Sequence, residues 1–150
     1  MRSRIGAAAV ALAGLLAVPG CATTNAIDDA RKLAIYRAAA GEPVNSFSYL
    51  GRVTGWTPLG DQHIAVWSRP SQAWLLSLHG PCQDLDFTPV IGLTSQGSRV
   101  YAGFDKVLVH SRASIQLPCR IREIRPLDTT AIKAAEKAAR EEAQDASSGT

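Results

Sequence analysis

Hydrophobic and polar positions divide this 150-residue chain into an apolar start, a short helical segment, a strand-rich middle and a polar helical end. Apolar residues return at helical spacing over residues 27–40, where Asn25 can cap the helix and Gly41 and Pro43 end it. Two aspartates in the first turn suit the helix dipole. The apolar side of this segment is small, so we expect the helix to lie only weakly on a domain.

Between Phe47 and Ile124 the pattern changes to short apolar runs separated by turn residues. A hairpin is predicted around Pro70, because proline favours the second position of a tight turn, and another around Asp105. In one run Trp74, Leu76 and Leu78 alternate with more polar neighbours, which predicts a half-buried strand. The candidate strands are residues 47–56, 62–69, 72–79, 88–95, 98–104, 106–112 and 119–124.

Residues 130–150 form the polar end of the chain, a predicted helix that starts at Asp128 or Thr129. Oppositely charged residues four positions apart stabilise it locally. Ile132 is almost its only large apolar residue, so we expect an exposed helix that frays into a disordered tail after about residue 145. The alternative is that this helix docks onto a partner.

The apolar start has the order of a secretory signal. Arg2 and Arg4 precede an apolar run from Ile5 to Val18, and small residues follow. This run is shorter than the roughly 20 apolar residues that a membrane-spanning helix needs. We therefore predict that residues 1–20 are a signal peptide that is removed on export.

The segment Val18-Pro19-Gly20-Cys21 ends the apolar run and resembles the lipobox of bacterial lipoproteins. In that class a lipid is attached to the cysteine thiol and the signal is cut directly before it. The resemblance implies cleavage between Gly20 and Cys21, with lipidation of Cys21. Ala22 follows where an aspartate would imply inner-membrane retention, so the outer membrane is expected. The alternative is an ordinary signal peptide that is cut nearby.

The positive charge of the chain belongs largely to this signal. The formal net charge is +3, with 16 Lys and Arg against 13 Asp and Glu. Removal of residues 1–20 takes away two arginines and no acid, which leaves 14 against 13. A protein that binds nucleic acid needs a cluster of positive charge to neutralise phosphates, so we expect no nucleic-acid partner.

Cys82 and Cys119 remain once Cys21 is assigned to the anchor, and a cysteine pair in an exported protein is most simply a disulfide. A metal site that includes His79 is the alternative, but no CxxC or HxxxH pair accompanies it and Pro81 breaks a helical presentation. A catalytic thiol would need a reduced partner and a positioned base. We therefore predict one disulfide, no metal and no cofactor.

No sequence motif identifies catalytic chemistry, because GxSxG, HExxH and P-loop patterns are absent. The candidate functional carboxylates are Asp84, Asp86 and Asp105, of which Asp105 is more simply a turn former. The histidines are expected to be surface or hydrogen-bonded side chains, and the tryptophans core or rim residues, with a sugar- or peptide-binding face as the alternative. These residues are His63, His79, His110, Trp56, Trp67 and Trp74.

Over about residues 41–129, four motifs follow one another: GEPVNSFSYLGRVTGWTPLGDQHIAVW, WLLSLHGPCQDL, VYAGFDKVLV and CRIREIRPLD. In this order they resemble a DUF6491-like domain family of unknown function, carried by small exported proteins and lipoproteins of Gram-negative bacteria. The resemblance supports a single domain and the pairing of Cys82 with Cys119. It implies no activity.

These features predict a mainly β protein, α+β by content. After a tether at 21–26, residues 27–129 are expected to form one antiparallel barrel or sandwich of about six strands, led by the helix at 27–40. We expect an outer-membrane lipoprotein that faces the periplasm and binds an envelope protein or glycan without catalysis. The alternatives are a periplasmic hydrolase of envelope glycans or peptides and a structural tether that docks through its C-terminal helix. The hydrolase would use Asp84, Asp86, Asp105 or His79.

Overall fold

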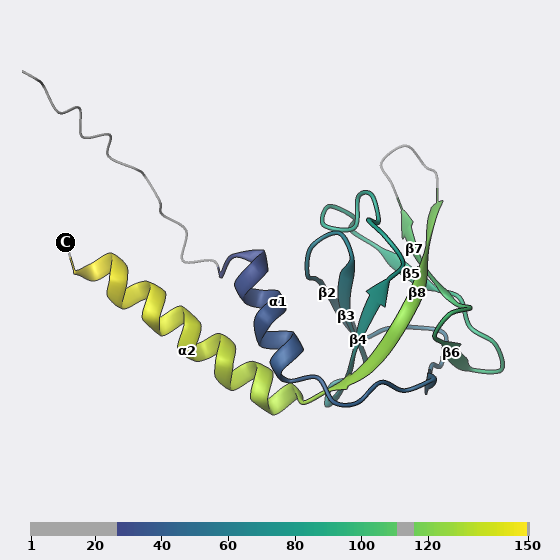
Figure 1. Ribbon diagram of the computed structural model, residues 1–150, viewed down its shortest axis with the longest axis horizontal. Coiled ribbons are helices and arrows are strands. Elements are labelled where there is room, and N and C mark those ends of the chain that lie inside the picture. Colours follow the sequence, from purple (N-terminus) through teal and green to yellow (C-terminus); the bar gives the residue numbers. More distant parts are fainter. Residues whose placement is uncertain (1–26, 111–115, 150) are drawn as a thin grey trace, which may run out of the picture.

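The computed structural model describes residues 27–110 and 116–149 (Figure 1). This part of the chain holds two helices and eight strands. In chain order they are α1 (Asp29–Ala38), β1 (Ser46–Ser48), β2 (Gly55–Pro58), β3 (His63–Arg69), β4 (Gln72–Leu78), β5 (Ile91–Leu93), β6 (Arg99–Tyr101), β7 (Lys106–His110), β8 (Gln116–Leu127) and α2 (Thr129–Ser148). The predicted signal, lipobox and tether lie outside the described residues.

Six of the strands form one antiparallel sheet, in the order β2-β3-β4-β8-β7-β5, and this sheet curls into a half-barrel. The other two, β1 and β6, pair as a separate two-stranded sheet. The half-barrel is flanked by the two helices, and in Figure 1 α1 lies between α2 and the sheet. The expectation of a small, mainly antiparallel β fold with a helix before it and a helix after it is confirmed.

The predicted strand at 47–56 is in fact two strands that belong to different sheets. Phe47 in β1 pairs with Val100 of β6, whereas Trp56 in β2 pairs with Val66 of β3. Between them Gly51 has a φ of 83°, a left-handed conformation that glycine adopts without steric cost. The chain therefore changes sheets at the glycine-containing link.

The predicted hairpin around Pro70 is confirmed, because β3 and β4 pair directly on either side of it. The hairpin predicted around Asp105 is wrong. There β6 pairs with β1, while β7 pairs with β5 and β8. Two short strand-like runs joined by a turn fit the sequence pattern of a hairpin. In the structure, however, the two strands belong to different sheets, so each pairs with strands of its own sheet.

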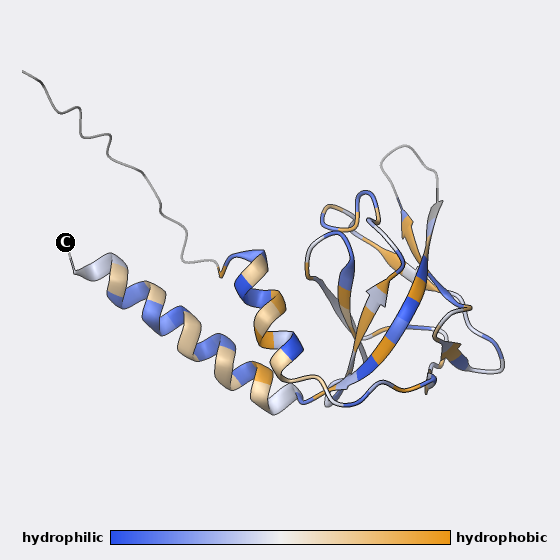
Figure 2. Cartoon of the chain, in the orientation of Figure 1, coloured by the Kyte–Doolittle hydropathy of each residue, from blue (hydrophilic) through white to orange (hydrophobic). Residues whose placement is uncertain are grey.

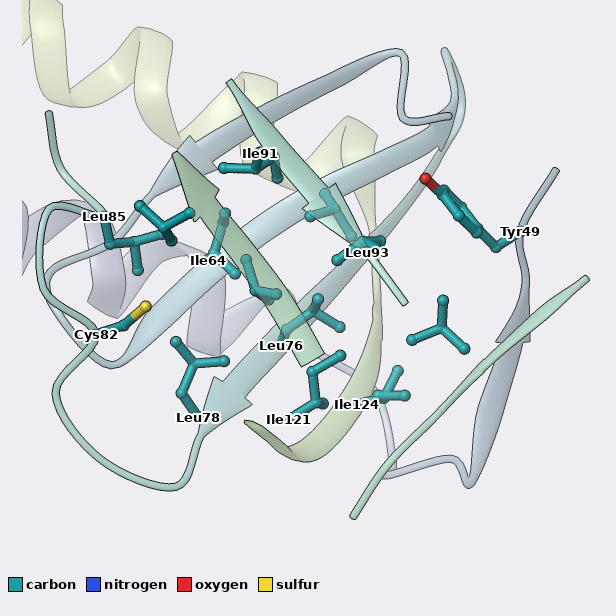
Figure 3. Close-up of a cluster of buried hydrophobic side chains, with 14 of the residues drawn as sticks. Tyr49, Ile64, Leu76, Leu78, Cys82, Leu85, Ile91, Leu93, Ile121 and Ile124 are labelled. Carbon is teal, nitrogen blue, oxygen red and sulfur yellow. The ribbon is translucent and has the colours of Figure 1, made fainter. Parts of the chain in front are cut away.

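One hydrophobic core fills the concave side of the half-barrel (Figure 3). Ile64, Leu76 and Ile124 come from three neighbouring strands of the large sheet and are each 0% exposed. Phe47, from the two-stranded sheet, stacks on Trp74 with ring centroids 5.0 Å apart. The two-stranded sheet thus contributes to the same core and helps to close the open side of the half-barrel.

A second core lies on the outer face of the sheet, beneath α1. Tyr36 of α1 meets Trp67 of β3 edge to face, with ring centroids 6.2 Å apart. Ile132 of α2 joins the same cluster. Leu75 belongs to this second core and is 3% exposed, and Ser77, two residues further along the same face, is 5% exposed. β4 is therefore buried on both faces, and the expectation of a half-buried strand is wrong.

The helix ends differ from those expected. Asp28, not Asn25, caps α1, since its carboxylate accepts a hydrogen bond from the Arg31 N–H. Asp128 caps α2 in the same way. Helix α2 is described as far as Ser148, beyond the expected start of the tail, and both terminal serine hydroxyls donate to the carbonyl of Gln144.

Among the residues described, no helix is long and apolar enough to cross a membrane. A disulfide joins Cys82, in the loop after β4, to Cys119 in β8, with the Cα atoms 5.8 Å apart. The predicted pairing is therefore present. It links the loop that leaves the middle of the sheet to its longest strand.

Candidate functional site

A polar row crosses the outer face of the sheet at the end that the second core leaves uncovered. His63, the first residue of β3, lies opposite Ser77 of β4, and Ser77 lies opposite Glu123 of β8. Residues that face one another across antiparallel strands have Cβ atoms roughly 4.5–5.5 Å apart. The register therefore brings an imidazole, a hydroxyl and a carboxylate side by side on one face.

A β-bulge in β8 adds a cation to this row. The pairing between β4 and β8 shifts between Ser77 and Leu78, so that Leu78 faces Ile121 while Ser77 faces Glu123. Ile121 and Ile124 both point into the inner core and are 0% exposed. A bulge redirects side chains in this way, and it leaves Arg122 and Glu123 together among the residues that line one pocket on the outer side. Along its length β8 carries both hydrophilic and hydrophobic residues (Figure 2).

The end of α1 forms the opposite wall. Arg37, in the last helical turn, and Ala40 line a pocket with Leu75 and the polar row, and Arg125 of β8 completes it. The pocket encloses about 280 Å³. This is close to the lower end of the roughly 300–1,000 Å³ typical of ligand pockets, so it suits a small chemical group. We call it the arginine pocket.

Arg37 fixes the protonation state of His63. A guanidinium nitrogen of Arg37 lies 3.1 Å from Nε2 of His63. Because arginine can only donate, Nε2 must accept and the ring proton must sit on Nδ1. Burial, followed by the positive charges of Arg37 and Arg122, lowers the pKa of His63 below its usual value. The imidazole is therefore neutral at neutral pH.

Glu123 is held ionised by a neighbour in its own strand. Nε of Arg125 donates to Oε1 of Glu123 at 2.7 Å, and this hydrogen bond lowers the pKa of Glu123. A second nitrogen of Arg125 donates to the carbonyl oxygen of Gly41 at 3.2 Å. With His63 neutral, the three arginines and one glutamate of the pocket leave a net charge of +2.

Several polar groups of the pocket have no partner among the residues that the structure describes. Arg122 makes no hydrogen bond or ion pair with any residue in 27–110 or 116–149, and Oε2 of Glu123 accepts none there. The hydroxyl of Ser77 makes no hydrogen bond within these residues either, and none of their fully buried side-chain polar atoms is unsatisfied, so this hydroxyl is reachable from the pocket. The pocket therefore presents unused donors beside one unused acceptor.

This arrangement suits binding better than nucleophilic catalysis. In a serine hydrolase, a histidine nitrogen accepts the serine proton and lies between the serine and the carboxylate. Here Ser77 occupies the middle of the row, and Nε2 of His63 already accepts from Arg37. Unpaired guanidinium groups, in contrast, are the preferred protein ligands of carboxylates and phosphates.

A second groove lies between the two helices and β2–β3, with Tyr36, Trp67 and Ile132 among its lining residues. It encloses about 490 Å³, and its one carboxylate, Glu136, is already engaged by neighbouring side chains. Glu136 accepts from Tyr36 at 3.1 Å and from Arg140 at 3.3 Å. Burial, then the negative charge of Glu136, raises the pKa of Tyr36 to about 12. These contacts hold α2 on α1.

Of the candidate carboxylates, Asp105 supports a turn. It is 3% exposed, and its two oxygens accept from the Tyr101 N–H and from the Thr94 hydroxyl, both at 2.7 Å. Asp84 and Asp86 are exposed in the loop between β4 and β5, and Asp84 has a φ of 60°. Burial, then the negative charges of Asp29 and Asp61, raises the pKa of Asp86. None of these carboxylates lines the arginine pocket.

The remaining candidates are dispersed. His79 and His110 are exposed, and Trp56, Trp67 and Trp74 are half-buried against one of the two cores. No group of three or more His, Cys, Asp or Glu side chains within the described ranges could hold a metal ion. Of the histidines, His63 is the one that lines the arginine pocket.

Sequence reasoning missed the other polar residues of the pocket. Arg37 lies on α1, Ser77 on β4, and the other three on β8, and no motif joins these three elements; the three on β8 are Arg122, Glu123 and Arg125. The available signal was the run of charged residues in the last predicted strand, CRIREIRPL. Strict alternation would place Arg122 and Glu123 on opposite faces, so the bulge that unites them was not visible in the pattern.

The fold and the pocket together define a small disulfide-linked β half-barrel protein, flanked by two helices, with a cationic pocket on the outer face of its sheet. The chain belongs to a family of unknown function, DUF6491, whose family model matches residues 1–143. The match includes the N-terminal segment and most of α2, beyond the region of the resemblance. No curated protein and no solved structure matches the chain.

Proposed function

We propose that the protein is a lipid-anchored binding module of the bacterial outer membrane that captures an anionic group in the arginine pocket. The lipobox-like segment ending at Cys21 supports the anchor, and Ala22, at the position where an aspartate would imply inner-membrane retention, supports the outer membrane. A lipid anchor confines the module to a surface. This raises its effective concentration near other surface-bound molecules, so that even a weak site is occupied.

The observation that carries the binding proposal is Arg122. Its guanidinium has no partner within the described part of the chain, and it lines the same pocket of net charge +2 as Arg37. This arrangement suits an external anion. Charge-assisted hydrogen bonds from arginine are about twice as strong as neutral ones. No step of bond making or breaking is needed to explain this arrangement, which favours a binding role over an enzymatic one.

The test is titration of the full-length protein, purified in a non-ionic detergent, with acetate, sulfate and phosphate, followed by the NMR shifts of arginine side-chain groups. We expect at least one anion to bind saturably. Arg122→Glu should weaken this binding by about tenfold or more, since it replaces a charge-assisted bond by repulsion.

Arg69→Glu is the matched control, because Arg69 is an exposed arginine at the far end of β3 and does not line the pocket. It should leave the affinity unchanged. If no anion binds saturably, or if the two variants lose affinity equally, the pocket is not an anion site and the proposed function is wrong.

A further inference from the structure

The composition of the arginine pocket narrows the kind of anion it accepts. Its donors come from two walls, with Arg37 on α1 and Arg122 on β8, and Ser77 lies in the polar row of the sheet. A carboxylate presents its two oxygens in one plane, which one guanidinium can satisfy in bidentate fashion. A tetrahedral anion presents oxygens in several directions, and donors on separate walls suit it better.

Glu123 distinguishes among tetrahedral anions. Its Oε1 is occupied by Arg125, while Oε2 accepts no hydrogen bond from the part of the chain that is described. The hydrogen bond from Arg125 lowers the pKa of Glu123, so the carboxylate is ionised at neutral pH and can only accept. A free acceptor beside an anion repels an anion without protons and hydrogen-bonds to one that still carries an O–H.

We propose, on the basis of the proposed anion-binding function, that the arginine pocket selects a phosphate group that retains a P–OH, with the guanidinium groups holding its oxygens and Glu123 accepting its proton. Inorganic phosphate keeps at least one P–OH throughout the neutral range. A phosphate monoester, whose second pKa is about 6, keeps one in part of its population near neutral pH. Sulfate, carboxylates and phosphate diesters do not. The volume of about 280 Å³ suits one such group rather than an entire large ligand.

Two sources share this chemistry, namely free phosphate and the terminal phosphate monoester of a larger headgroup. Inorganic phosphate and methyl phosphate serve as their probes, while dimethyl phosphate, sulfate and acetate are the anions without a proton. All five are titrated against the full-length protein in detergent at pH 6.5, and dissociation constants are compared.

We expect inorganic phosphate to bind at least about tenfold more tightly than sulfate, the ratio expected when one hydrogen bond is exchanged for a repulsive contact. Methyl phosphate should bind far more tightly than dimethyl phosphate if a headgroup is the source. Binding of inorganic phosphate without methyl phosphate identifies the free ion as the source. Either outcome supports selection for the P–OH group.

Glu123→Gln supplies the decisive comparison, because the amide removes the negative charge that repels sulfate. Sulfate should bind more tightly to this variant than to the wild type, and the preference for phosphate should fall by about tenfold. A gain of sulfate affinity cannot come from loss of folding. Glu136→Gln is the control, since Glu136 also pairs with an arginine but lies on α2, outside the pocket.

The inference is wrong if sulfate, acetate or dimethyl phosphate binds the wild type as tightly as inorganic phosphate does. It is also wrong if Glu123→Gln leaves the ratio of phosphate to sulfate affinity unchanged. In those cases the pocket still binds anions and the proposed function stands. Failure of all five anions to bind would overturn the proposed function itself.

Discussion

At Asp105, a side chain that qualified as a functional carboxylate instead holds the fold together. Its carboxylate receives hydrogen bonds from the Tyr101 N–H and the Thr94 hydroxyl and is almost fully buried. Its own backbone N–H and C=O are also bonded, to Tyr101 and to Ile121. The residue therefore joins the end of β6 to β7, β8 and the segment after β5.

Asp105→Ala should lower the free energy of unfolding by about 1–3 kcal/mol, because it leaves a buried N–H and a hydroxyl without their acceptor. Urea-induced unfolding followed by tryptophan fluorescence measures this change. Asp61→Ala, which alters an exposed carboxylate in the turn before β3, should shift stability by no more than about 0.5 kcal/mol. Equal effects of the two substitutions would contradict the structural role of Asp105.

In the arginine pocket, by contrast, residues that no sequence pattern singled out line the candidate site. Ser77 and Glu123 belong to no recognisable motif. The pairing register of β3, β4 and β8 places them in one row with His63. Their chemistry arises from neighbours that are distant in the sequence. Arg37, for example, determines which nitrogen of His63 holds the proton.

Among the elements, α2 differs most from its expected description. Most of its side chains are exposed, but Ile132 and Ala139 are each 3% exposed. Around Ala139, Glu136 accepts from Tyr36 and Glu142 is ion-paired with Arg31, so that this stripe of α2 faces α1. A small residue is sufficient here because the two helices approach closely.

Ala139→Glu should weaken the packing of α2 on α1, since it places a charge without a partner at a buried position. We expect a loss of about 1–3 kcal/mol, together with faster hydrogen exchange along α2. Ala138→Glu provides the matched control, because Ala138 is the adjacent exposed alanine. If Ala139→Glu exchanges as slowly as Ala138→Glu, α2 is not held by this face.

At the scale of the whole molecule, two cores on opposite faces of one sheet and a single disulfide hold the chain together. The bridge spans 37 positions between Cys82 and Cys119. Closing a loop of this length is worth about 4 kcal/mol in the chain-entropy treatment. That is a large part of the roughly 5–15 kcal/mol by which small proteins are stable.

The proposed anchor makes a separate prediction for the molecule as a whole. Cys21→Ala should release the protein from membranes, because attached acyl chains contribute about 0.8 kcal/mol for each buried CH₂. Membrane fractionation with an alkaline wash measures this release. The paired substitution Cys82→Ala with Cys119→Ala is the control, and it should remain membrane-bound while losing stability. A Cys21→Ala protein that still sediments with membranes would contradict lipidation at Cys21.

The sequence by itself determined the local features of this protein. Three features were predictable: the β3–β4 hairpin around Pro70, the pairing of Cys82 with Cys119, and the presence of one helix before and one helix after the strands. Each depends on nearby residues or on the small number of available cysteines. Turn preference and hydrophobic periodicity depend on residues close together in the sequence, and a small number of cysteines allows few pairings. These features can therefore be predicted from the sequence alone.

Only the tertiary structure decided which strands pair and which polar residues meet. The sequence pattern predicts that β6 pairs with β7. In the structure β6 pairs with β1 in the small sheet, while β7 pairs with β8 in the large sheet. Likewise, the bulge before Glu123 places Arg122 in the pocket, and α1 brings Arg37 to the opposite wall. These contacts depend on strand register and on packing between elements. A shift of one residue in the register moves every side chain of a strand to the other face of the sheet, and the local sequence pattern does not specify the register.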